Sequence, residues 1–336
     1  MSKQIVYKSV FAPYFNSFLQ MKEQMGFTRT GFANTFKELD RFFVATRATE
    51  PHITREQITA WSETRINDKA RTLYDKHSIM RQFCHYMCHL GYECYIHRLP
   101  RQNWPPFIPY IFSHIQMECI FQAADKLMLP NRCMTSVLIV IPCLIRLLYS
   151  TGMRIGEALS LQNEDVDLMR KRILLKQTKN QVERLLPICP SLLEVLEQYK
   201  TYRNRMPVKG VSSPEAFFFV STVGNPVSMS SVRHRFREIL AQCGIPRRSD
   251  GQGPRIHDVR HTTAVHSLIK MVKSGMDIYC AMPILSVFLG HKSLKGTETY
   301  VRLTSEMYPE VLKMESPITS FVFPSNPYIQ IDHGND

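Results

Sequence analysis

The chain of 336 residues has no hydrophobic run long enough to cross a lipid bilayer. Its longest apolar run covers residues 136–148 (SVLIVIPCLIRLL) and is interrupted by Pro142 and Arg146. A membrane-spanning helix needs about 20 predominantly apolar residues. The run therefore predicts a helix that is buried in the core of a soluble protein.

The sequence also lacks a disulfide framework, a secretory leader and internal repeats. Its nine cysteines are odd in number and follow no regular spacing, which favours free, mostly buried thiols in a reducing compartment. The first residues, MSKQIVYKSVFAPYF, contain no continuous apolar segment followed by a small-residue cleavage site. We therefore expect a cytoplasmic protein.

Acidic residues are scarce relative to basic ones. There are 29 Asp and Glu against 42 Lys and Arg, which gives a formal net charge of +13. A positive field of this size favours a polyanion, and nucleic acid is the leading partner. Charge alone leaves a basic protein of a membrane surface open as an alternative.

The chain is long enough for two domains. Apolar residues at helical spacing predict an all-helical domain over residues 1–99, including a helix over 67–90 and a helix start capped by Thr54 with Gln57. Four prolines in LPRQNWPPFIP predict an extended linker over 100–109. A second domain over 110–315 and a tail over 316–336 follow. The fold class is mainly α with a small antiparallel β-sheet.

Helical patterns in the second domain cover about 113–128, 135–150, 191–206, 230–243 and 259–273. Residues 171–186 instead contain two strand-compatible runs around a polar turn at about 178–182, which predicts a β-hairpin.

Four short motifs of the second domain carry the candidate chemistry. The segment TGMRIGEAL places Arg154 and Glu157 one helical turn apart, and the hairpin turn carries Lys179. The segment HDVRH places His257 and Arg260 three residues apart. Leu-Gly-His, ending at His291, precedes Tyr300 by nine residues. Each motif alone is a weak signal, because an isolated lysine, histidine or tyrosine is usually a surface or core residue.

In this order and spacing the motifs resemble those of the tyrosine recombinase family, also called the phage integrase family, which includes the Cre, Xer and lambda integrase proteins. The resemblance covers about residues 110–315 and implies a mixed α/β catalytic domain behind a helical core-binding domain. It implies the catalytic set Arg154, Lys179, His257, Arg260, His291 and Tyr300, with Glu157 in support of the first arginine. Lys179 is chosen over Lys176 because of its register with the R-x-x-P segment that ends at Pro187.

These residue types suit attack on a phosphodiester. Two guanidiniums can hold the non-bridging oxygens of a phosphoryl group that gains charge, so that neither a metal nor another cofactor is expected. Tyr300 is the expected nucleophile, and His257 would take or return its proton. His291 would donate a hydrogen bond to the phosphate. In the family the product is a 3′-phosphotyrosine with a free 5′-hydroxyl, whose formation Lys179 would assist as an acid.

Two features depart from the simplest family pattern. The interval between Arg260 and His291 is longer than expected, with the additional residues in MVKSGMDIYCAMP. This length resembles recombinases carried by transposons and favours integration or excision of a mobile genetic element. Tyr308 also follows His291, but at the wrong spacing for the nucleophile.

Basic residues outside the motifs are candidates for contacts to DNA phosphates, which position a protein without reading sequence. They are Arg65, Lys69, Arg71 and Lys76 in the first domain and Arg233, Arg235 and Arg237 in the second. A solvated helical face is the alternative for the first group. The thiols and imidazoles between Cys84 and His97 suggest zinc, but their spacing matches no zinc motif, and we expect no metal site.

The resemblance implies double-stranded DNA with paired core sites as the substrate and a homotetramer as the active form. It leaves room for accessory recombinases or a directionality factor, and the tail beyond Tyr300 would dock on a neighbouring subunit. Two other functions remain open at this point: DNA relaxation by a type IB topoisomerase, and a non-catalytic DNA-binding module.

Overall fold

The computed structural model describes residues 5–102, 108–128, 136–176, 183–245, 253–291 and 293–307. For Lys295 and residues 305–307 it describes the backbone alone. The chain divides into two compact units, one ending at residue 107 and the other beginning at Ile108. This division lies inside the proline-rich segment. Each unit has its own hydrophobic core.

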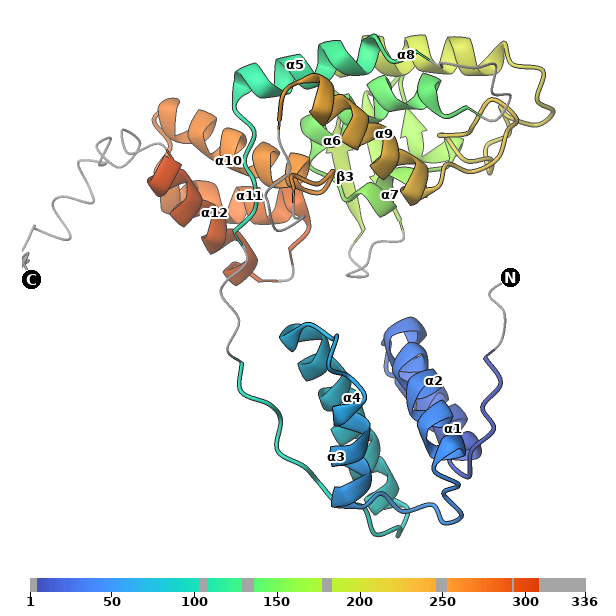
Figure 1. Cartoon of the computed structure of the whole chain (residues 1–336). Helices are drawn as coiled ribbons and strands as arrows, with labels where there is room; N and C mark the ends of the chain where they lie inside the picture. The colour runs from blue at the N-terminus through green and yellow to red at the C-terminus, as the bar shows by residue number, and fades with distance from the viewer. Residues whose placement is uncertain are drawn as a thin grey trace, which may run out of the picture. The chain divides into compact units, whose positions relative to one another are not determined.

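The first unit contains four helices. They are α1 (Ala12–Gln24), α2 (Arg29–Ala45), α3 (Arg55–Glu63) and α4 (Ala70–His89) (Figure 1). Their core is rich in aromatic side chains, with Phe15 stacked on Phe36 at a centroid distance of 4.5 Å. The expected cap of α3 is confirmed, because the Thr54 hydroxyl accepts a hydrogen bond from the Gln57 backbone and the Gln57 side chain accepts one from the Thr54 backbone.

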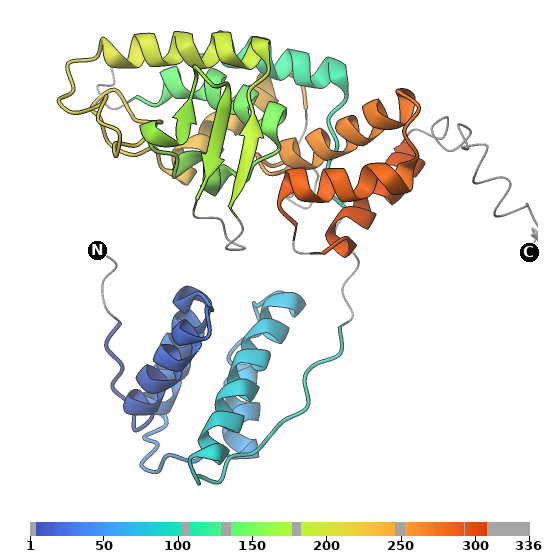
Figure 2. The same cartoon turned by 180° about the vertical axis from the view of Figure 1, so that it is seen from behind.

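The second unit combines helices with three short strands. Its elements are α5 (His114–Asp125), the 3₁₀ helix η1 (Leu138–Val140), α6 (Ile141–Thr151), α7 (Ile155–Leu159), η2 (Asn163–Asp165), β1 (Val166–Asp167), β2 (Arg172–Leu175), β3 (Arg184–Pro187), α8 (Pro190–Asn204), α9 (Met229–Gln242), α10 (Asp258–Lys273), α11 (Ile278–Leu289) and α12 (Lys295–Met307). In both views α10, α11 and α12 gather at one end of this unit (Figures 1 and 2). The mainly helical fold with a small sheet is confirmed.

The sheet is antiparallel throughout, with the strand order β1-β2-β3 (Figure 2). Its register pairs Ile173 with Leu186, and both side chains are buried. The two expected strands of the hairpin are confirmed as β2 and β3. The turn with Lys179 lies outside the described residues. Strand β1 was not expected from the sequence.

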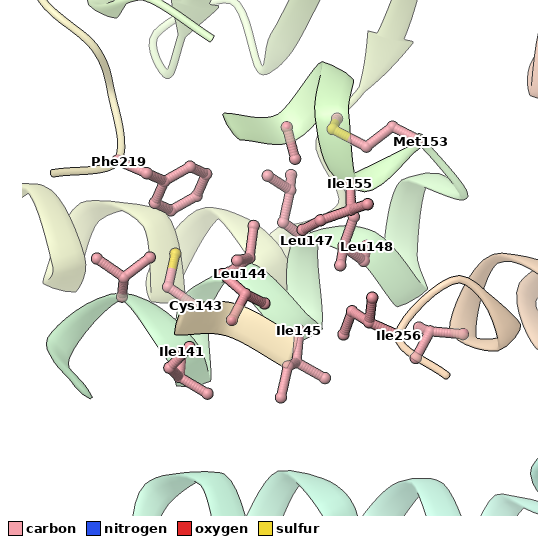
Figure 3. Packing of buried hydrophobic residues seen from close by; sticks show 14 of the residues in the cluster. Ile141, Cys143, Leu144, Ile145, Leu147, Leu148, Met153, Ile155, Phe219 and Ile256 are labelled. Atoms are coloured by element: carbon pink, nitrogen blue, oxygen red, sulfur yellow. The ribbon is translucent and has the colours of Figure 1, made fainter. Parts of the chain in front are cut away.

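The apolar run at 136–148 forms η1 and most of α6, and α6 lies in the core of the second unit. Leu144, Ile145 and Leu147 are fully buried. Met153 and Ile155 continue this packing beyond the end of α6, and Ile256 approaches from the segment before α10 (Figure 3). The helix therefore packs against α7 and α10, which follow two of the motif residues or carry them, and also against α5 and α8.

Over the described ranges, no helix is both long and apolar enough to cross a membrane. The cysteines in these ranges are free thiols. The expectation that most of them are buried is wrong, because only Cys84 and Cys143 are buried in the described ranges. Cys88, Cys189 and Cys280 are exposed, and the others are partly buried.

Candidate active site

Two helices end side by side at glycines, and each end delivers one motif. Helix α6 ends at Gly152 and α11 ends at Gly290, both in the left-handed conformation with φ of 60° and 68°. This conformation is favourable for glycine and costly for other residues. A Cβ atom at Gly152 would lie only 2.9 Å from Cδ2 of Leu289. The backbone before Arg154 therefore packs against the side chain of Leu289, two residues before His291.

Arg260 joins these two helix ends. Its Nη1 donates a hydrogen bond to the carbonyl of Gly152 at 2.6 Å, and its Nη2 donates one to the carbonyl of Leu289 at 2.7 Å. The residue is 3% exposed. Burial, followed by the charge of Arg154, lowers the pKa of Arg260 to about 10, so the guanidinium is still charged at neutral pH. The Arg260 side chain therefore connects α10 with the ends of α6 and α11, three elements that are far apart in the sequence.

Glu157 lies between two arginines. One oxygen accepts a hydrogen bond from Nη1 of Arg154 at 2.8 Å, and the other accepts from Nη2 of Arg184 at 2.8 Å and from the Arg154 backbone at 2.9 Å. Burial alone would raise the pKa of Glu157, but these hydrogen bonds and the charge of Arg184 hold it below its usual value. The predicted supporting role of Glu157 thus has a defined geometry, in which the carboxylate orients Arg154.

Arg184, at the start of β3, belongs to this cluster although sequence reasoning did not select it. Its guanidinium packs against Gly290 so closely that a Cβ atom there would clash with it. Its Nε and Nη1 are buried and have no hydrogen-bond partner among the described residues. The R-x-x-P segment was the available signal, but it was used only to set the register of Lys179.

The predicted histidines approach the arginines from two sides. His257 precedes α10, and burial, followed by the charge of Arg260, lowers its pKa. The Nδ1 of His291 lies 2.9 Å from the hydroxyl of Thr297 in α12. Burial, followed by the charges of the nearby arginines, lowers the pKa of His291 to about 4, so its ring is neutral at pH 7.

Tyr300 in α12 faces this cluster and is 3% exposed. Its hydroxyl lies 2.9 Å from Nδ1 of His261, and its ring lies nearly parallel to that of His291 at a centroid distance of 6.1 Å. Burial raises the pKa of Tyr300, while Arg260 and Arg154 act against this rise. His261 was not selected from the sequence, since its position next to Arg260 gave no sign of contact with the tyrosine.

Of Lys176 and Lys179, the two candidates for the hairpin lysine, the structure describes only Lys176. This residue follows β2 and is bound by Glu164 at 2.5 Å and by Asp165 at 3.0 Å. The hydrogen bond to Glu164, followed by that to Asp165, raises the pKa of Lys176. An ammonium held in this way is a poor proton donor. Lys179 itself lies outside the described residues.

The basic candidates for DNA contact differ in their surroundings. On α9, Arg233 and Arg237 are exposed, whereas Arg235 donates to Glu238 at 2.7 Å. In the first unit, Lys69 and Arg71 are exposed at the start of α4. Lys76 is bound by Glu38 at 2.6 Å and by Asp68 at 2.9 Å, and Arg65 also donates to Glu38. Arg233 and Arg237 lie in solvent where phosphates can reach them, whereas Arg235, Arg65 and Lys76 must first leave a carboxylate.

No group of three or more His, Cys, Asp or Glu side chains suited to a metal ion occurs in the part of the chain that the structure describes. This part includes Cys84, His85, Cys88, His89, Cys94 and His97. Burial raises the pKa of the Cys94 thiol to about 11.

The sequence is similar to those of known recombinases and integrases. The profile of the phage integrase family matches residues 111–307. A putative integrase/recombinase of Sinorhizobium fredii, y4rB, is 28% identical over 313 residues, which cover 91% of this chain and 96% of that protein. The tyrosine recombinase XerC of Chlamydia caviae is 30% identical over 175 residues, which cover 52% of this chain and 51% of XerC.

Solved structures share the fold. A XerH site-specific recombinase bound to its palindromic difH substrate aligns with a TM-score of 0.61 and 18% identity, covering 85% of this chain and 79% of that one. A lambda integrase dimer bound to a COC′ core site aligns with a TM-score of 0.59 and 17% identity, covering 86% and 94%. Since the family profile matches most of the second unit, the chain belongs to the phage integrase family and is a tyrosine-type site-specific DNA recombinase.

Proposed function

We propose that this recombinase cleaves and rejoins DNA through a 3′-phosphotyrosine formed on Tyr300. The observation that carries the proposal is the meeting of Tyr300 with Arg154 and Arg260. Burial raises the pKa of Tyr300, and the charges of Arg260 and Arg154, with a hydrogen bond between Arg260 and the tyrosine, oppose this rise. A nucleophile beside two fixed guanidiniums is suited to attack on a phosphodiester.

The two arginines would bind the non-bridging oxygens of the scissile phosphate. Their orientation is fixed before DNA arrives, because Arg260 is bound to two backbone carbonyls and Arg154 to Glu157. Preorganised donors of this kind stabilise a transition state without reorganisation during the reaction. His257 and His291 border the same cluster and would contribute further hydrogen bonds to the phosphate.

The leaving 5′-oxygen needs a proton, and Lys179 is the proposed acid. The engagement of Lys176 by two carboxylates supports this assignment indirectly. Arg184 ties the first residue of β3 to Glu157, so the strand that follows the hairpin turn is anchored at the arginine cluster.

The proposed biological role is integration or excision of a mobile genetic element in the bacterial cytoplasm. The long interval after Arg260 supports it, and so does the likeness to the putative integrase/recombinase y4rB. The structural neighbours include a lambda integrase tetramer on a Holliday junction and a Tn1549 transposon integrase in complex with transposon right end DNA. We propose that this chain likewise works as a tetramer on paired sites, with its tail docked on a neighbour.

The test uses the full chain and a library of nicked duplexes with randomised sequence. A nick next to the cleavage site releases a short fragment and traps the covalent adduct, which survives detergent and can be sequenced. We expect the wild type and Tyr279→Phe to form adducts, since Tyr279 is 69% exposed on α11, and Tyr300→Phe to form none. An adduct that persists in Tyr300→Phe would remove this tyrosine as the nucleophile.

The selected site then separates recombination from DNA relaxation. A recombinase joins the cleaved strand to a second, differently labelled duplex that carries the same site. A topoisomerase of type IB reseals the same strand and relaxes supercoils. Absence of any adduct would instead favour a DNA-binding module without catalysis.

A further inference from the structure

Two histidine rings, those of His261 and His291, lie against Tyr300, and they make different contacts with it. The Nδ1 of His261 is 2.9 Å from the tyrosine oxygen. The His291 ring lies nearly parallel to the tyrosine ring, and its own Nδ1 is engaged by Thr297. His257, the residue before α10 and four residues before His261, meets the His261 ring edge-on at a centroid distance of 4.9 Å.

The packing of α10 against α12 keeps this contact in place. Tyr300 belongs to a buried cluster with Ala264, Val265 and Leu268 of α10. His261 precedes these residues on the same helix, so its ring and the tyrosine ring are presented by two elements with a shared core. The contact therefore has a rigid framework, as a proton transfer between fixed groups requires.

Burial and the basic groups around His261 keep its ring neutral before DNA binds. Burial, followed by the neighbouring basic groups, lowers the pKa of His261 to about 3. These groups are His257, Arg260 and Arg255 from α10 and the segment before it, and His291 from the loop after α11. A phosphodiester held by the arginines would bring negative charge among them. The same binding event that places phosphorus before Tyr300 would thus make the imidazole a better proton acceptor.

We propose that His261, in place of His257, accepts the phenolic proton when Tyr300 attacks phosphorus. The inference rests on the proposed function. The Oη–H bond of Tyr300 breaks and its proton goes to Nδ1 of His261, while a bond forms between Oη and phosphorus. The bond from phosphorus to O5′ breaks, and O5′ takes a proton from the general acid. During rejoining, the same Nδ1 returns the proton to the departing tyrosine oxygen.

The test replaces His261 with Asn, whose amide reaches the position of Nδ1 and keeps a hydrogen bond but cannot take up a proton at neutral pH. Single-turnover cleavage of a nicked duplex recovered from the adduct selection is followed between pH 5.5 and 9.5. We expect His261→Asn to bind DNA like the wild type and to cleave roughly 10²- to 10⁴-fold more slowly, the range for general acid–base catalysis. Its rate should rise with pH beyond the point where the wild-type rate levels off, because the tyrosine must then ionise without help.

His257→Asn is the comparison variant. As a phosphate contact it is expected to cleave more slowly, but with a pH profile of wild-type shape. A loss below tenfold in His261→Asn, or a profile parallel to the wild type, would overturn the inference. If His261→Asn does not fold, His261→Gln is judged by the same two criteria. If the inference about His261 fails, adducts that form with the wild type and not with Tyr300→Phe still support the proposed function. If the wild type forms no adduct, both the proposed function and the inference about His261 are wrong.

Discussion

Arg184 and Glu157 form an ion pair with 2.8 Å between Nη2 and Oε2, and their side chains are only 7% and 5% exposed. Loss of one partner from a buried pair leaves an uncompensated charge, which typically costs about 3–5 kcal/mol. We expect Arg184→Met to lower the free energy of unfolding by about 3 kcal/mol, since Arg154 still binds Glu157. Urea denaturation followed by circular dichroism measures the change.

Lys176→Met is the matched control for Arg184→Met. It removes the ion pairs of Lys176 with Glu164 and Asp165, in which the lysine side chain is 40% exposed. We expect its unfolding midpoint to stay close to that of the wild type. Equal losses in the two variants would mean that the buried pair has no special role in stability.

Substitution by alanine should have opposite effects on stability at Gly152, which follows α6, and at Gly156, which lies in α7. Gly152→Ala forces a side chain into the left-handed conformation, at about 1–2 kcal/mol, and brings Cβ to 2.9 Å from Leu289. Gly156→Ala lies inside α7 with open space around the new atom and should stabilise by about 0.5–1 kcal/mol. Thermal melts of both variants are the measurement. A stable Gly152→Ala variant would contradict the close approach of α6 and α11.

Two threonines of α12 test the support of His291. Thr297 lies 2.9 Å from Nδ1 of His291, whereas the hydroxyl of Thr304 is buried without a partner among the described residues. Thr297→Val should slow single-turnover cleavage by roughly 10-fold or more, because an unanchored ring is no longer held in one orientation. Thr304→Val should cleave like the wild type and be at least as stable. Similar cleavage rates in the two variants would show that this contact does not orient His291.

The motif positions and most helices were predictable because their signals are local. Caps and glycine stops lie within a few residues of the ends they define, as at Thr54 and Gly152. The roles of Arg184 and His261 were not predictable. Their partners lie 27 and 39 residues away in other elements. The pairing of Lys76 with Glu38 was hidden for the same reason, since a basic residue in a sequence does not show which carboxylate it meets.

Buried histidines predict the pH dependence of stability. Burial lowers the pKa of His97 and His266 to about 4, against an ordinary value of 6.5. Below pH 6.5 these histidines bind protons in the unfolded chain but not in the folded chain. The free energy of unfolding therefore falls as the pH falls towards 4. Each such histidine contributes up to about 1.4 kcal/mol per pH unit in this window. Melting temperatures should drop between pH 7 and pH 5, and a constant or rising melting temperature would contradict these environments.

Substitution of the exposed arginines of α9 should affect DNA binding, whereas substitution of an active-site arginine should affect cleavage. Arg233→Gln combined with Arg237→Gln should weaken DNA binding and reduce the slope of log affinity against log salt by about 0.9 per lost phosphate contact. Arg235→Gln should reduce it less, because Glu238 already binds this side chain. Arg154→Ala should lose cleavage and change the slope by no more than the one contact to the scissile phosphate. Wild-type slopes in both α9 variants would place α9 away from DNA.

The central claim is that Tyr300, held against the arginine cluster, becomes covalently bound to DNA. The most direct measurement is mass spectrometry of peptides from the detergent-resistant adduct after nuclease digestion. The account predicts a nucleotide attached through its 3′-phosphate to Tyr300 in the peptide of α12. Attachment to any other residue, Tyr308 included, would contradict it.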